Sequence, residues 1–118
     1  MKITIETVAH ADQRYDTVGD WQWCGNDLVV RVSYMDDWRH VAAIAVHELV
    51  EALLCRDMGV SQEAVDKFDT AYKGDGEPGD DPQAPYRDEH CIATAVERML
   101  IATFGISWAD YDAKVNAL

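Results

Sequence analysis

Residues 28–57, LVVRVSYMDDWRHVAAIAVHELVEALLCRD, change from the pattern of a β-strand to that of an α-helix. The stretch 28–35 is rich in β-branched side chains, which favour extended backbone. Asp36 or Asp37 can cap the helix that follows, because a short acidic side chain accepts hydrogen bonds from the free N–H groups of a first turn. The helix is expected to run to about residue 57, ahead of a glycine that can end it.

The rest of the chain is expected to form strands before residue 36 and helices after it. Residues 2–8 alternate apolar and polar side chains, WQWC at 21–24 can form a second short strand, and GND at 25–27 is turn sequence. Further helices are predicted over 61–73, 86–105 and 107–118, with an acidic Gly/Pro loop over 74–85. The prediction is a single α+β domain, 1–118, with an antiparallel or mixed sheet of two to three strands (1–35) followed by three to four helices (36–118).

Charge and composition exclude several classes of partner. The 118 residues include 10 basic and 22 acidic side chains, a net charge of −12, which argues against binding nucleic acid through its phosphates. No apolar run approaches the roughly 20 residues of a membrane span, and MKITIETVAH lacks the apolar segment of a signal peptide. We therefore expect a cytoplasmic protein that binds neither nucleic acid nor membrane, with an oligomeric state that the sequence leaves open.

Three cysteines, Cys24, Cys55 and Cys91, are expected to be free buried thiols. Their number is odd, and their spacings match no zinc knuckle.

The segment HELVE, residues 47–51, places ionisable groups in the most apolar helix. His47 and Glu51 are four residues apart, so their side chains project from one face and can reach the same metal ion. Glu48 is rotated by about 100° from His47 and can reach a water molecule beside that ion. A carboxylate among apolar neighbours is costly to desolvate unless it is paired or bound to a cation. The helix is expected to bury two stripes, this mixed one and an aliphatic one formed by Val46, Leu49, Val50 and Leu53.

A catalytic zinc needs a third protein ligand, and the helix predicted over 86–105 offers candidates. His90 and Glu97 share one stripe two turns apart and can face HELVE if the two helices pack antiparallel. His90 is the first choice, because imidazole suits zinc. Glu97 is the second choice, or it accepts a hydrogen bond that orients His90. Asp69 is a weaker third choice.

Several of these residues also have ordinary structural explanations. Glu48 with Arg98, or Glu51 with Arg56, could form ion pairs, and His47 could be a hydrogen-bonded core histidine. His40 shares the stripe but lies near the start of the helix, and His10 is assigned no role. The acidic loop is expected to be solvated, with a flap over the site as the alternative.

HELVE resembles the H-E-x-x-H helix of the zincin metallopeptidases, with Glu51 where that family has its second histidine. A strand that leads into this helix, over residues 28–55, adds to the resemblance. HELVEALLCRDMG, EPGDDPQAPYRDEH and ATAVERML are also similar to small uncharacterised phage and prophage proteins. The zincin resemblance implies a minimal zincin-like fold, Zn²⁺ as cofactor, His47 and Glu51 as metal ligands, and Glu48 as general base.

The leading hypothesis is a small zinc-dependent hydrolase of peptide bonds, with zinc on His47, Glu51 and His90. One alternative is a non-enzymatic phage accessory protein whose −12 charge engages a basic surface. Another is a helical metal-dependent phosphohydrolase that draws ligands from Asp66, Asp69, His90 and Glu97.

Overall fold

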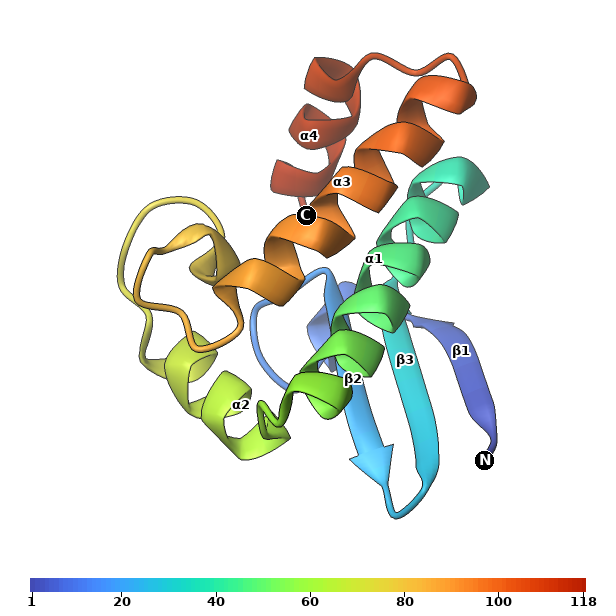
Figure 1. The fold of residues 1–118 in the computed structure, drawn as a ribbon. Helices are drawn as coiled ribbons and strands as arrows, with labels where there is room; N and C mark the ends of the chain where they lie inside the picture. Colours follow the sequence, from blue (N-terminus) through green and yellow to red (C-terminus); the bar gives the residue numbers. More distant parts are fainter.

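The N-terminal part of the protein is a three-stranded mixed sheet. The computed structural model describes residues 1–118. Its strands β1 (Ile3–Val8), β2 (Gly19–Cys24) and β3 (Asp27–Ser33) lie in the order β1-β3-β2. β3 is central; it pairs parallel with β1 and antiparallel with β2. Four helices follow, which confirms the predicted α+β class (Figure 1).

Three of the four helices begin at a residue whose side chain caps the first turn. Asp37, Ser61 and Ser107 each accept a hydrogen bond from a backbone N–H of the first turn. The first helix ends at Gly59, which adopts φ 75°, a conformation that costs glycine little. The helices are α1 (Trp38–Met58), α2 (Gln62–Ala71), α3 (Arg87–Thr103) and α4 (Trp108–Asn116), and the acidic loop holds a short 3-10 helix, η2 (Pro78–Asp80).

α1 covers one face of the sheet over β2 and β3 (Figure 1). Leu28, Val30 and Val32 of β3 are fully buried beneath it. Ile3 and Ile5 pair with Leu28 and Val30 and therefore point to the same face, yet they are 43% and 48% exposed. The helical layer thus covers the sheet at β2 and β3 and leaves β1 uncovered.

α3 packs along α1, with the chain running in the opposite direction (Figure 1). His47 contacts Glu97, and Glu51 contacts His90, so later residues of α1 meet earlier residues of α3. The antiparallel packing expected for these helices brings the two histidines together.

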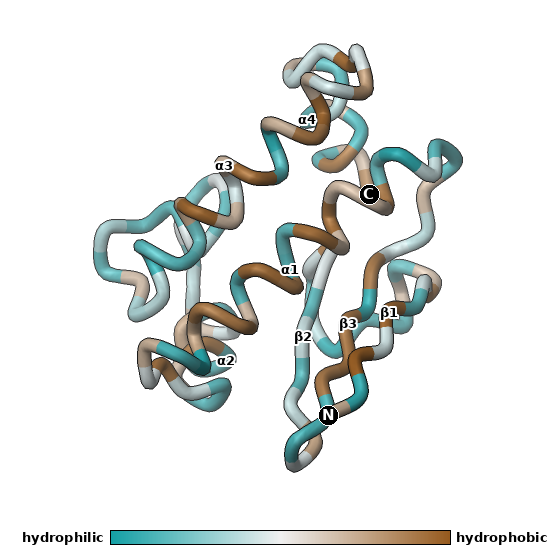
Figure 2. Tube along the Cα trace, turned by 45° about the vertical axis from the view of Figure 1, so that its right-hand side comes forward, coloured by the Kyte–Doolittle hydropathy of each residue, from teal (hydrophilic) through white to brown (hydrophobic).

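Only one of the two predicted buried stripes of α1 is fully buried. The mixed stripe lies between the sheet and α3; it includes His40, Ile44, His47 and Glu51. The aliphatic stripe faces outward: Val46, Leu49 and Val50 are half-buried, and Leu53 is 37% exposed. Small side chains at Ala43, Ala45 and Ala52 allow the close approach on the buried side. Figure 2 shows the resulting mixture of apolar and polar segments along α1.

All three cysteines are free, as predicted, but only one of them is buried. Cys55 is buried and free, and burial raises the pKa of its thiol to about 12, so it stays protonated. Cys24 and Cys91 are free but exposed. The first ends the β2 strand at the hairpin turn, and the second lies on the outer side of α3, where no element covers it.

No helix by itself has the length and hydropathy needed to cross a membrane. α3 and α4 taken together satisfy that test by length and composition alone, with a bend of 116° between them.

The contrast between the two sides of α1 gives a stability prediction. Leu28→Ala should lower the free energy of unfolding by about 2–5 kcal/mol, because it leaves a cavity under α1. Leu53→Ala should cost less than about 1 kcal/mol, because Leu53 already contacts water. Urea unfolding of the two variants measures both values. Equal losses would contradict the outward orientation of the aliphatic stripe.

Candidate metal centre

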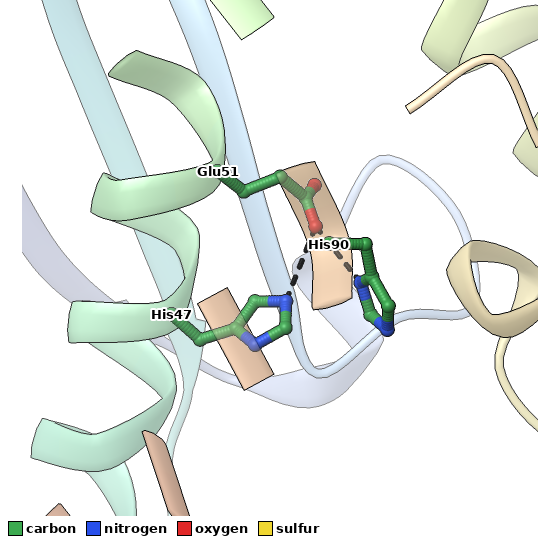
Figure 3. Close-up of side chains that lie close together, drawn as sticks. All are labelled: His47, Glu51 and His90. Atoms are coloured by element: carbon green, nitrogen blue, oxygen red, sulfur yellow. Dashed lines mark hydrogen bonds and ion pairs between the residues drawn. The ribbon is translucent and has the colours of Figure 1, made fainter. Parts of the chain in front are cut away.

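Three buried side chains from two helices converge between α1 and α3. Figure 3 shows His47 and Glu51 on α1 and His90 on α3, with the carboxylate of Glu51 between the two rings. Glu51 Oε2 lies 3.2 Å from His47 Nε2 and 2.9 Å from His90 Nδ1. All three side chains are more than nine-tenths buried. The structure therefore brings together the three residues that the sequence predicts as metal ligands.

The spacing of these atoms suits a metal ion. One ligand atom from each residue lies within 4.8 Å of the others. Two ligands at about 2.0–2.1 Å from a tetrahedral zinc ion are about 3.3 Å apart, close to the two separations seen here. The cluster could hold a metal ion after small movements of the side chains.

The second oxygen of Glu51 is also fixed. Trp21, on β2, donates a hydrogen bond of 3.0 Å from its indole Nε1 to Glu51 Oε1. The indole therefore leaves Oε2 as the oxygen that faces the two histidines. No sequence signal singled out Trp21, because its contact depends on the packing of α1 against β2.

The second nitrogen of each histidine also faces a carboxylate. His47 Nδ1 lies 2.8 Å from Glu97 Oε1, although the two atoms are not aligned for a hydrogen bond. Tyr111, on α4, donates a hydrogen bond to Glu97 Oε2 and holds that carboxylate in place. Glu97 was expected as a ligand or as a partner of His90. It contacts His47 instead, because its position two helical turns after His90 on antiparallel α3 places it opposite the earlier residue of α1.

His90 meets two carboxylates of the acidic loop. Its Nε2 lies 3.1 Å from Asp80 Oδ1 and 3.2 Å from Glu77 Oε2. A carboxylate on the outer nitrogen of a histidine fixes the tautomer and leaves the other nitrogen free for a metal. The loop is therefore not simply solvated, because η2 and the residue before it contact the cluster.

The charges around the cluster favour a cation. Burial lowers the pKa of His47, but Glu51 and Glu97 outweigh burial and raise it to about 11. The same balance, with Glu51 and Glu77 as the carboxylates, raises the pKa of His90 to about 10. Burial raises the pKa of Glu51, yet the hydrogen bonds from both histidines bring it down to about 2. The carboxylates around the cluster outnumber its two imidazoles. Without a metal ion, protons on the histidines supply the balancing positive charge.

Glu48 lies beside the cluster, against the start of β2. Its carboxylate packs on Gly19, where an added Cβ would come within 2.6 Å of Glu48 Oε1. Burial, followed by the charge of Glu51, raises the pKa of Glu48 well above its usual value. No hydrogen bond or ion pair joins Glu48 to the rest of the chain, so its carboxyl is free to interact with a bound molecule.

A cleft of about 360 Å³ opens next to Glu48 and the cluster. Acidic residues, tyrosines and histidines line it, and no lysine or arginine does. Arg14 lies behind the wall, where it pairs with Asp20 at 2.7 Å and Asp66 at 3.0 Å. These ion pairs connect the segment before β2 to α2. The guanidinium of Arg14 itself does not line the cleft.

Asp69 is not a metal ligand in this arrangement. Its carboxylate accepts hydrogen bonds from the hydroxyl groups of Tyr15, at 3.0 Å, and Tyr86. The Tyr86 ring stands edge-on to His90, with 6.0 Å between the ring centres. Asp69 therefore supports a wall of the cleft.

The two arginines and the two other histidines considered from the sequence lie outside the ligand cluster. Arg56 stacks over Trp23, and Arg98 over Trp108, so neither forms the ion pair considered for Glu51 or Glu48. His40 is buried against Tyr111, away from the cluster. His10, which was assigned no role, hydrogen-bonds Ser33 and Asp16 and lines the cleft.

Comparison of the chain with protein-family models, with curated proteins and with solved structures finds no match.

Proposed function

We propose that the protein is a zinc-dependent hydrolase of peptide bonds, with the ion on His47 Nε2, Glu51 Oε2 and His90 Nδ1. The observation that carries the proposal is the convergence of these three buried atoms. Their fit to a metal is supported by the partners of the remaining polar atoms, Trp21 on Glu51 and carboxylates on both histidines. Two imidazoles and one carboxylate form a donor set that occurs at catalytic zinc.

In this proposal, different residues of the chain hold the metal and transfer the proton. When bound, zinc supplies Lewis acidity, which makes a water molecule a stronger nucleophile. Glu48 is the free carboxyl of the cleft and lies on the flank of the ligand helix, so we assign it as the group that accepts a proton from water and passes it to the leaving amine. Gly19 makes room for this carboxyl, since any side chain there would displace it.

The first residues of β2, Gly19 to Trp21, lie next to the cleft. Val18 accepts a hydrogen bond from Ser33 on the paired side of the strand, whereas the N–H of Trp23 points to the opposite edge and donates to Gln62. Antiparallel pairing alternates, so the N–H groups of Gly19 and Trp21 also point away from β3, and both residues are buried. The cleft-side strand is thus β2, whereas the strand that leads into α1 is the central β3.

The charge of the cleft argues against the phosphohydrolase alternative. A phosphate ester is anionic, and the cleft offers it carboxylates without a lysine or arginine. The acidic accessory protein remains the second hypothesis, since the net charge of −12 suits a basic partner. The accessory-protein hypothesis predicts that binding to this partner weakens as salt is added and that Glu48→Gln has no effect on it. A cytoplasmic location stays a prediction.

Metal content tests the proposal directly. Protein purified without chelator should contain about one zinc ion per chain. Removal of the ion should lower the melting temperature, because an ion that binds only the folded state stabilises it. Elemental analysis and a thermal melt with and without added zinc provide the measurements. A chain that binds no zinc and melts at an unchanged temperature would reject the metal centre.

A further inference from the structure

We propose that the acidic loop 74–85 positions His90 for metal binding, through the backbone of Gly79 and the carboxylates of Glu77 and Asp80. This inference rests on the proposed metal centre and assigns a role to a segment that contributes no ligand to it. The loop joins α2 to α3 and lies against the start of α3 (Figure 1).

The first contact is steric. Gly79 is buried, and the position of its missing Cβ faces the imidazole of His90. A Cβ at this position would come within 2.4 Å of His90 Cγ and 2.5 Å of His90 Nδ1, the nitrogen assigned to the metal. Contacts this short would force the ring or the loop to move. The absence of a side chain at Gly79 therefore allows the loop to close on the ring.

The second contact is electrostatic. Asp80 and Glu77, on either side of Gly79, reach His90 Nε2 at 3.1 and 3.2 Å, although their side chains are 65% and 55% exposed. A carboxylate at Nε2 keeps a proton on that nitrogen, so Nδ1, which faces Glu51, is the nitrogen that can give up its proton to a metal ion. The backbone thus limits where the ring lies, and the carboxylates select which nitrogen faces the cluster.

Positioning of this kind acts on metal affinity, since it reduces the reorganisation that binding requires. Loss of a carboxylate partner to a ligating histidine weakens metal binding by about 10–100-fold. We expect Gly79→Ala to lower zinc affinity within this range, and the double variant Glu77→Ala/Asp80→Ala to do the same. Glu77→Gln/Asp80→Asn should keep more of the affinity, because an amide oxygen still accepts a hydrogen bond from Nε2–H.

The experiment measures zinc affinity by competition with a chromophoric chelator, together with the visible spectrum of the cobalt-substituted protein. Asp75→Ala is the matched control. This substitution removes one carboxylate from the same loop, and the Asp75 side chain makes no contact with His90, so the variant should bind zinc as the unmodified chain does. The cobalt spectrum should shift in Gly79→Ala and not in Asp75→Ala, which separates a change at the ligand from a general loss of stability.

The outcomes separate this inference from the proposed function. Unchanged affinity and cobalt spectrum in both Gly79→Ala and Glu77→Ala/Asp80→Ala would overturn the positioning role while the metal centre stands. Glu77, Asp80 and His90 could also hold an ion by themselves. If the unmodified chain binds two ions and the double alanine variant binds one, the loop holds an ion of its own and the positioning role is overturned. A chain that binds no zinc at all would reject the metal centre, and this inference with it.

Discussion

Glu48→Gln is expected to abolish turnover and to leave the bound metal in place. The amide has nearly the shape of the carboxyl and can still pack against Gly19, but it cannot accept a proton from water. General acid–base catalysis contributes about 10²–10⁴-fold to rate, so the loss should fall in that range. Steady-state cleavage of a peptide library, with zinc content measured on the same samples, provides the test.

Glu63→Gln is the matched control for this substitution. Glu63 lies in the first turn of α2, is exposed and does not line the cleft. The Glu63→Gln variant should cleave peptides at the same rate as the unmodified protein. Full activity in Glu48→Gln would remove Glu48 from the mechanism. A salt-sensitive partner that both variants bind equally would favour the accessory-protein hypothesis.

His47→Ala should nearly eliminate zinc binding. A zinc ion held by protein ligands contributes about 10–16 kcal/mol of binding free energy in small domains, so one of three ligands accounts for several kcal/mol. At 1.4 kcal/mol per tenfold, the affinity should fall on the order of several hundredfold or more. The loss of the ring also leaves Glu97 without its histidine partner. Chelator competition measures the affinity.

The chain offers a control on the same helix. His40 is buried in α1 on the same stripe as His47, but it packs against Tyr111 and not against Glu51. His40→Ala should cost stability and lower zinc affinity far less than His47→Ala does, since His40 reaches the ligand set only through Tyr111 and Glu97. Equal losses in the two variants would mean that unfolding, and not ligand removal, causes the effect.

Local sequence signals were sufficient for the elements and for the ligand cluster. Cap residues and glycines set the start and end of α1, and the four-residue spacing of His47 and Glu51 placed both on one face. His90 could be chosen because two helices that pack antiparallel bring particular turns together. These inferences depend on periodicity within a helix, which a sequence carries directly.

Contacts that depend on how the elements pack could not be predicted in this way. The alternation of β1 did not reveal that it pairs parallel with β3, and the hydropathy of α1 predicted a second, aliphatic buried stripe that is only partly covered. The partners of the cluster, Trp21 from β2 and Asp80 from η2, come from distant segments with no shared spacing. Glu97 was placed on the correct stripe but with the wrong histidine, because the stagger between α1 and α3 is a tertiary property.

The two glycines that touch functional side chains suggest how distant relatives of this chain could be recognised. Gly19 lies against the candidate base, and Gly79 lies against the third candidate ligand; at each, an added methyl group would collide with the side chain it faces. A search for related sequences could therefore require glycine at both positions in addition to the HExxE segment and the later histidine. Such a pattern describes the shape of the site as well as its chemistry, and it can be applied where overall similarity has been lost.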